Sequence, residues 1–254
     1  MKAFLDRAWP ALLLMALILV GWELGARAAG SPNVPPFSAV LQALVAHAAE
    51  ILPQMLNTLR RAAIGLLLAA LTMIPLGILI GRIRWLADLL EPVIDLLRPL
   101  PPPAIAPLVM LFAGIGDGAK ITVIFYTAAF PILIHAIDGI RGTHPLLHTV
   151  ARSLRLGRAE ALWFVDLPAT LPVIMTGLRL AVAAALLVSV TAEMLLSTDG
   201  IGVYLLRSQE TFRIADGLAG ICVIALVGWA INSAFLELDR RLLNWHHATT
   251  NTQA

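Results

Sequence analysis

Cysteine and charge are both scarce in this 254-residue chain. Its single cysteine, Cys222, excludes an intrachain disulfide and a cysteine metal cluster. Charged residues make up 13% of the sequence, against roughly 25% in soluble domains, whereas hydrophobic residues make up 59%. The formal net charge of +2 is too small for the dense basic patch of a nucleic-acid-binding protein. The composition therefore excludes a typical soluble protein and indicates a chain built of membrane spans.

Long stretches with few charges predict the number of these spans. A helix needs about 20 apolar residues to cross about 30 Å of hydrocarbon, because its backbone amides must be satisfied within the helix. Six stretches meet this condition. The first includes Glu23 and Arg27, which can form an i,i+4 ion pair, and the fifth includes Arg179, whose side chain can reach water. They are residues 8–29, 62–81, 99–116, 121–137, 172–196 and 217–236. We expect an all-α polytopic membrane protein with about six transmembrane helices.

The first stretch could also be interpreted as a cleavable signal, but no small-residue cleavage site follows Trp22. With six spans, both termini lie on one side, and that side holds twelve of the eighteen basic residues, which predicts that it is the cytoplasm. Arg60 and Arg61 lie on the opposite side, and we expect an interfacial helix over residues 38–61 before the second span.

This pattern divides the chain into three parts. Residues 1–56 hold the first span with a periplasmic or interfacial segment. Residues 57–241 form the core transmembrane domain, and residues 242–254 form a polar tail. The longest loop predicted to be cytoplasmic, residues 141–171, belongs to the core.

This loop predicts two short amphipathic helices, at residues 145–156 and 158–165, with Leu167-Pro168 ending the second. Two interpretations are open: a loop that lies on lipid headgroups, or a docking surface for a cytoplasmic partner. The apolar stripe of the first helix consists of Leu146, Leu147, Val150 and Leu154.

Five prolines between Pro99 and Pro107 cannot sit in one regular helix, so we expect the third span to be broken or extended. Broken backbone at membrane depth must be covered by protein or line a water-filled cavity, which places this segment at a pathway or a dimer interface. Glu193 is the one acidic residue well inside a span; it either hydrogen-bonds to a neighbouring element or contacts substrate, and an anionic substrate would favour the first role. The candidates for lining a pathway are Pro102, Met110, Thr122, Ser189, Thr191 and Glu193.

Several motifs together resemble the permease subunits of bacterial ABC importers, in particular the nitrate, taurine and aliphatic sulfonate branch. Residues 151–154 and Leu167-Pro168 together resemble the cytoplasmic coupling motif of that family. The other motifs that carry the resemblance are Arg98-Pro99-Leu100-Pro101-Pro102, Gly114-Ile115-Gly116-Asp117-Gly118-Ala119-Lys120, Leu167-Pro168-Ala169-Thr170-Leu171-Pro172, Thr176-Gly177-Leu178-Arg179-Leu180-Ala181, Ala192-Glu193-Met194 and Gly200-Ile201-Gly202.

The resemblance implies a type I importer permease in the bacterial inner membrane. It implies a homodimer that pairs with two cytoplasmic ATPase subunits and receives a small anionic solute from a periplasmic binding protein. The residues that it assigns to ATPase coupling are Ala151, Arg152, Ser153, Leu154, Arg155, Leu156, Gly157, Leu167 and Pro168. Thr149-Val150-Ala151 replaces the family's Glu-Ala-Ala, and Arg155 replaces its glycine, which predicts a continuous helix where the family turns sharply.

The chain carries no nucleotide-binding motif of its own. The glycine-rich segment 114–120 lacks the Gly-Lys-Ser/Thr ending of a phosphate-binding loop, so ATP and Mg²⁺ are expected on a separate subunit and no cofactor on this one. His144 and His148 have no third ligand nearby, and no metal site is expected. Neither HExxH nor GxSxG occurs, which argues against an intramembrane enzyme. An ion-driven secondary transporter is the alternative, but it predicts more intramembrane carboxylates and an internal repeat.

Overall fold

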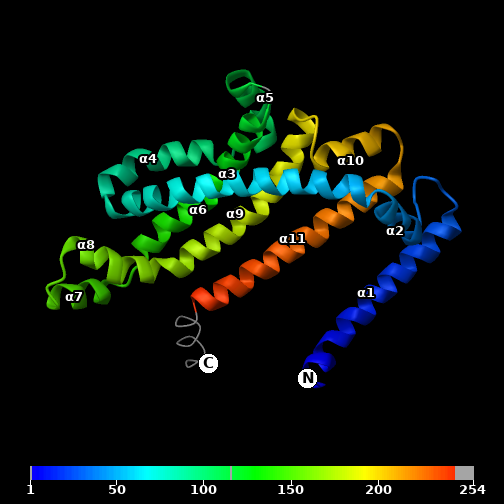
Figure 1. The fold of residues 1–254 in the computed structure, drawn as a ribbon. Helices are drawn as coiled ribbons and strands as arrows, with labels where there is room; N and C mark the ends of the chain where they lie inside the picture. The colour runs from blue at the N-terminus through cyan, green and yellow to red at the C-terminus, as the bar shows by residue number, and fades with distance from the viewer. Residues whose placement is uncertain (1, 115, 244–254) are drawn as a thin grey trace.

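The computed structural model describes residues 2–114 and 116–243, and all the regular structure in that part of the chain is helical (Figure 1). The predicted polar tail lies almost entirely outside the described residues. The α-helices, with one π-helix labelled η1, are α1 (Lys2–Ala29), α2 (Phe37–Ala46), α3 (Ala48–Arg82), α4 (Arg84–Leu97), α5 (Pro102–Ala113), α6 (Asp117–Arg141), α7 (Pro145–Ser153), α8 (Arg158–Ala161), η1 (Leu162–Asp166), α9 (Leu167–Leu196), α10 (Ile201–Glu210) and α11 (Ile214–Leu242).

Five of the predicted spans are confirmed as long apolar helices: α1, α3, α6, α9 with the preceding α8 and η1, and α11. The third, residues 99–116, is broken, as its prolines predict. Its proline-rich start separates α4 from α5, and the two helices are bent by 100° relative to each other. Because α5 has only 12 residues, it becomes part of a sixth span only together with α4. The break that the prolines predict is therefore present, at residues 98–101.

The predicted interfacial helix over residues 38–61 is also corrected. A short helix, α2, ends at Ala46, and α3 then runs without interruption from Ala48 through Arg60 and Arg61 to Arg82. The two arginines thus lie within the same helix as the charge-free run that follows them.

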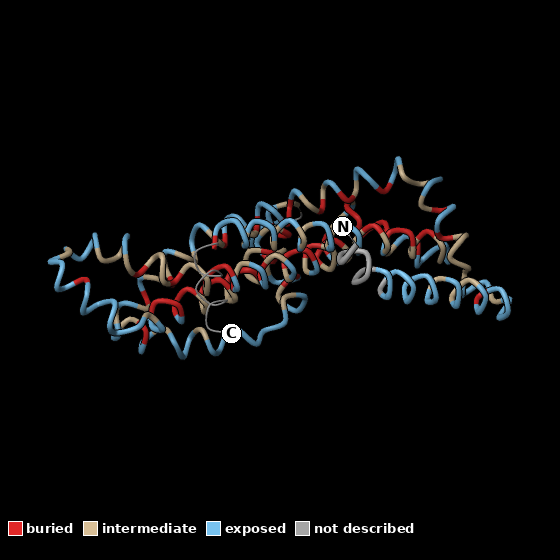
Figure 2. Tube along the Cα trace, turned by 90° about the horizontal axis from the view of Figure 1, so that it is seen from below, coloured by how far each residue is buried: buried red, intermediate tan, exposed pale blue. Residues whose placement is uncertain are grey.

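The centre of the bundle is formed by α6, which packs extensively against both α3 and α9 (Figure 1). Small side chains make this close approach possible: Ala69 of α3, Ala128 of α6 and Ala181 of α9 are all 0% exposed and meet around Ile132. The buried positions follow these inner helices, while exposed positions lie along their outer faces (Figure 2).

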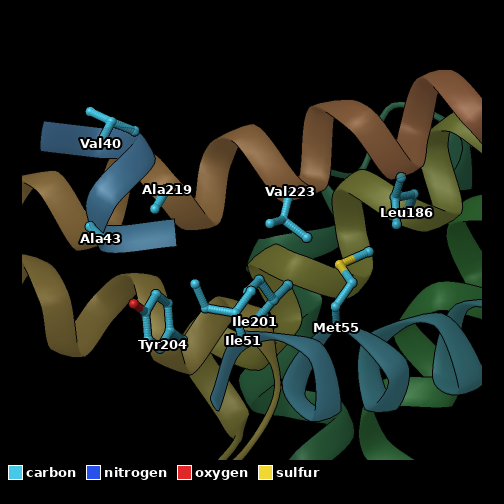
Figure 3. Packing of buried hydrophobic residues seen from close by; sticks show 9 residues of the cluster. All are labelled: Val40, Ala43, Ile51, Met55, Leu186, Ile201, Tyr204, Ala219 and Val223. Atoms are coloured by element: carbon cyan, nitrogen blue, oxygen red, sulfur yellow. The ribbon is translucent and has the colours of Figure 1, made fainter. Parts of the chain in front are cut away.

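A second apolar cluster joins five helices that are distant in the sequence (Figure 3). It fixes α2 and α10 onto α3, α9 and α11, so that the short helices cap one end of the bundle. Its members are Val40, Ala43, Ile51, Met55, Leu186, Ile201, Tyr204, Ala219 and Val223.

The first helix is the least buried of the candidate spans, with only 6% of its apolar window inside the protein. Its contacts are concentrated at its C-terminal end, where Trp22 donates to the carbonyl of Pro35 at 3.1 Å and Glu23 accepts from Ser38 at 2.8 Å. Most of the described remainder of α1 is exposed (Figure 2), and large apolar residues such as Leu13, Leu17 and Val20 are among its exposed positions, as in a helix surrounded by lipid.

The bundle therefore has two distinct ends. We call one the α7 end, where α3 finishes at Arg82 and α6 finishes at Arg141 beside α7 and α8 (Figure 1). The other is the α10 end, where α6 begins at Asp117, α9 finishes at Leu196 and α10 follows. The motifs singled out in the sequence gather at these two ends.

Candidate functional site

The chain turns sharply after α7, although Arg155 stands where the family that the chain resembles has glycine. The amide of Leu156 donates to the carbonyl of Ala151 at 3.0 Å and that of Arg155 to the carbonyl of Arg152 at 3.0 Å, which is the Schellman pattern of a helix end. Arg155 has φ +57°, the left-handed conformation that favours glycine. The predicted continuous helix over residues 145–156 is therefore wrong, because these two bonds stop α7 at Ser153 even without a glycine.

The second helix of this loop does not end at Leu167-Pro168 as predicted. It begins at Arg158, widens into the π-helix η1 and continues without a break into α9. Pro168 directly follows the wide π-helical turn of η1 and donates no backbone hydrogen bond to it. The chain therefore passes directly from the loop into a membrane span.

An exposed apolar groove of about 340 Å³ lies between α7 and the start of α9. Val150 and Leu154 of α7 line it on one side, 47% and 67% exposed, and Phe164 of η1 lines it on the other, 75% exposed. The same loop carries exposed arginines at positions 141, 152, 155 and 158. Ala151 is buried and holds α7 against the loop, while the other residues assigned to coupling that lie in α7 and its turn face outward or are half-buried.

At the α10 end, a buried arginine joins three carboxylates from different elements. The guanidinium of Arg61 donates to Glu193 at 2.9 Å, to Asp117 at 2.9 Å and to both oxygens of Asp199 at 2.8 Å. Arg61 is 2% exposed and Glu193 0%. Burial of charges without partners is strongly unfavourable, so this geometry requires all three helices α3, α6 and α9 to stay together.

Two more cations balance the charge of this network. Lys120 places its Nζ 3.2 Å from Asp117 and 3.6 Å from Asp199, and Arg60 lies 2.6 Å from Asp117. Burial alone would raise the pKa of the Asp199 carboxyl, but hydrogen bonds and attraction from Arg61, together with Lys120, hold that pKa below its usual value. We call these six residues, with Glu193 and Arg61 at the centre, the charge network.

The loop from α9 to α10 closes tightly onto Glu193. The second oxygen of Glu193 accepts from the hydroxyl of Thr58 at 2.8 Å and from the amide of Gly202 at 3.1 Å. Gly200 has φ +109°, and a Cβ there would lie 2.3 Å from the Glu193 carboxyl carbon. Only glycine fits, so the Gly200-Ile201-Gly202 motif serves this closure, and Glu193 has the hydrogen-bonding role that was one of its two interpretations.

The structure places the pathway candidates in three kinds of environment. Ser189 and Glu193 are fully buried, and Ser189 donates to the carbonyl of Thr58 at 3.3 Å. The hydroxyls of Thr122 and Thr191 bond to carbonyls of their own helices, and Met110 packs against the cluster between α5, α6 and α9. That these residues line a path stays a prediction.

Pro102, the remaining candidate, lines a cavity of about 310 Å³ beside the break between α4 and α5. Arg98, Tyr126, Thr127 and His135 supply its polar groups, and α9 closes it with apolar side chains. In the described part of the chain the backbone amide of Arg98 donates to the carbonyl of Ile94, but its guanidinium takes part in no side-chain hydrogen bond or ion pair. A small cavity with one available guanidinium is suited to a small anion.

Comparisons with known proteins agree with this architecture. Residues 73–243 match the family model of the binding-protein-dependent transport system inner membrane component. The chain is 34% identical to the taurine transport system permease protein TauC of Escherichia coli K12, over 92% of this chain and 88% of that protein. This chain belongs to the family of binding-protein-dependent transport system inner membrane components.

Other relatives show which branches of the family this permease resembles. It is 32% identical to the putative aliphatic sulfonates transport permease protein SsuC of Bacillus subtilis, over 93% of this chain and 87% of that one. It is 36% identical to the nitrate import permease protein NrtB of Leptolyngbya laminosa, over 71% and 64%. The crystal structure of an amino acid ABC transporter with histidines matches its fold with a TM-score of 0.62 at 16% identity, over 79% of this chain and 96% of that one. The permease is thus a multi-pass membrane component of an ABC importer.

Sequence reasoning missed most of the charge network in this permease. It found Glu193 but assigned no partners to Arg61, Asp117, Lys120 or Asp199. The available signal was the pair Arg60 and Arg61, which fell on the side poor in basic residues. Two cations at the edge of a charge-free run required acidic partners, but their position in sequence does not identify them.

Proposed function

We propose that two copies of this permease form the translocation pathway of an ATP-driven importer in a bacterial inner membrane, with both termini in the cytoplasm. A periplasmic binding protein delivers the solute, and a separate cytoplasmic ATPase dimer binds ATP and Mg²⁺. The family description, a binding-protein-dependent system, supports the first partner. The absence of a phosphate-binding loop from the sequence supports the second.

The observation that carries the proposal is the exposed groove at the α7 end. Large apolar side chains on a loop that faces water mark an interaction site. Here the turn at Arg155 holds them in one fixed arrangement. The exposed arginines of the same loop add charge that favours an acidic partner surface. Docking of the ATPase explains both features, whereas a loop lying on lipid would need the basic residues but no fixed groove.

Replacing the exposed Leu154 with a charged residue tests this docking. Leu154→Asp, alone or with Leu156→Asp, places a carboxylate in the groove and should abolish co-purification of the partner ATPase, while insertion into the membrane is unchanged. Leu154→Met keeps the groove apolar and should retain the ATPase. Recovery of the ATPase at wild-type level with the aspartate variants would show that it docks elsewhere.

For the substrate we propose a small anion. The relatives are named for taurine, aliphatic sulfonates and nitrate, which are small solutes that carry negatively charged oxygen atoms. The cavity beside the α4–α5 break, with the available guanidinium of Arg98, supports the same class of solute for this permease. Because one charge on a flexible side chain binds weakly, most of the specificity falls to the binding protein.

Uptake into proteoliposomes that contain the permease, the ATPase and the binding protein tests this class with taurine, sulfate and nitrate as probes. Arg98→Gln should lower ATP-driven uptake of the transported anion by about tenfold, the value of one charge-assisted hydrogen bond. Arg179→Gln, on the α9 face toward α11, is the matched control and should change uptake little. Uptake that is equal in both variants would remove Arg98 from the pathway, and uptake that needs an ion gradient but no ATP would favour a secondary transporter.

A further inference from the structure

The loop between α6 and α9 is fastened to the rest of the permease at three points. Two are covalent, the end of α6 at Arg141 and the start of α9 at Leu167. The third is an ion pair between Arg82, the last residue of α3, and Asp166, the last residue of η1. Among the described residues, every other side-chain hydrogen bond or ion pair of the loop stays within it or reaches the adjoining end of α6.

The π-helix places Asp166 for this contact. The amide of Leu167 donates to the carbonyl of Leu162, so the turn between them is one residue wider than an α-helical turn. In this wider turn Trp163 and Phe164 point outward, 67% and 75% exposed, while the Asp166 side chain points inward and is 3% exposed. The bulge thus presents the docking side chains on one face and the attachment to α3 on the other.

Arg82 is the principal partner of Asp166. Its Oδ2 accepts a hydrogen bond from Arg82, whereas its Oδ1 is buried without a hydrogen-bond partner. The other charged or titratable group near it is His148 of α7, whose Nδ1 lies 3.7 Å from Oδ1, too far for a hydrogen bond. A buried carboxylate with one donor depends on that donor for its position.

The helix that receives this contact reaches the opposite end of the bundle. Arg82 and Arg61 are 21 positions apart in α3, which corresponds to about 31 Å along a helix. Arg61 is held there by the charge network, and between the two arginines α3 is packed against α6 and α9. The ion pair therefore ties the helical segment that leads into α9 directly to α3 as well.

We propose that Arg82 and Asp166 are positioning residues that transmit movement of the docking loop to α3. This inference rests on the proposed function, because it requires an ATPase that docks on the loop and moves it. With the pair intact, displacement of η1 carries the end of α3 with it. Without the pair, displacement of η1 is no longer passed to the end of α3, and ATP hydrolysis is uncoupled from the movement of α3 while docking persists.

The experiment uses the complete complex with its ATPase and binding protein, in a Cys222→Ser background. A spin label on Leu56→Cys, an exposed position of α3 at the α10 end, reports the distance between the two copies before and after trapping with ATP and vanadate. Asp166→Asn and Arg82→Gln remove the ion pair. Arg82→Lys preserves it as a conservative rescue, and Arg84→Gln removes an exposed arginine two positions away as a matched control.

In Asp166→Asn and Arg82→Gln, we expect the ATPase to co-purify as in the wild type and to hydrolyse ATP. The fraction of complexes that reach the trapped distance should fall about fivefold or more, while Arg82→Lys and Arg84→Gln behave as the wild type. Wild-type distances in both pair-breaking variants would overturn the inference, and so would loss of ATPase binding, since the pair would then only shape the docking surface. A wild-type permease that retains no ATPase would instead refute the proposed function, so the two failures are distinguishable.

Discussion

Two arginines of α3, Arg61 toward the α10 end of the bundle and Arg82 at the α7 end, are held in different ways. At the α10 end, Arg61 is buried among three carboxylates, and Lys120 adds a second buried cation. At the α7 end, Arg82 is one-third exposed and has a single carboxylate partner, Asp166. A network of many bonds keeps one arrangement because no single bond can be exchanged without loss of the others. A single pair beside water can rearrange at much lower cost, so the α7 end is the end that is suited to movement.

The largest effect is expected from removing the centre of the charge network. Arg61→Met leaves Glu193 buried without its cation and should destabilise the permease by about 3–5 kcal/mol. Thermal unfolding of the purified permease in detergent measures it. Arg60→Met removes a neighbouring arginine that is largely exposed and should cost less than about 1 kcal/mol. Equal losses in the two variants would mean that burial does not distinguish these arginines.

A smaller effect is expected at the other end of the same helix. Arg82→Met deprives buried Asp166 of its one hydrogen-bond donor, but water reaches this site through the exposed part of Arg82, so we expect a loss of about 2 kcal/mol. Asp166→Asn removes the buried charge itself and should cost about 1 kcal/mol. The same unfolding measurement would contradict the comparison if Arg82→Met were as damaging as Arg61→Met.

The turn after α7 should respond to substitution with the opposite sign. Arg155 holds a left-handed conformation that glycine adopts without strain, so Arg155→Gly should stabilise the permease by about 1 kcal/mol. Arg152→Gly, inside α7, is the control and should destabilise it by about the same amount. A lower unfolding temperature for Arg155→Gly would indicate that the arginine side chain contributes more than its backbone costs.

The smallest effect concerns acid. Because the pKa of Asp199 is lowered in the folded protein, its contribution to stability is complete above the unfolded value of about 3.9 and is lost as the pH falls through the lower folded value. The difference in unfolding temperature between the wild type and Asp199→Asn should therefore be constant from about pH 5 to 8 and shrink below about pH 4. A difference that already shrinks near pH 6 would mean that another group controls this end.

The membrane spans could be predicted because charge-free runs are a local property of the sequence. The break before α5 was predictable for the same reason, since prolines act on their own helix. The return of α4 along α3 was not, because it depends on the extended backbone at Ile83 and on packing of Ala87 against Ile80 and Leu133. A short helix that is half exposed leaves no long apolar run to detect.

The sites were predictable only in part, because their geometry joins residues far apart in sequence. The apolar stripe of the loop over residues 141–171 is contiguous in sequence and could be predicted, and its leucines and Val150 are exposed in the structure. The end of α7 was predicted wrongly, since two backbone hydrogen bonds outweigh the preference against a left-handed arginine. Arg82 and Asp166 are 84 positions apart, and no local pattern connects them.

The charge network also imposes an order on the biogenesis of the permease. Arg61 enters the membrane with α3, but Asp117 follows 56 positions later and Glu193 only 132 positions later. A ribosome therefore delivers the cation long before its buried partner, and α6 supplies the first carboxylate. The network can close only after α9 has been made, so its closure comes late in the biogenesis of the permease.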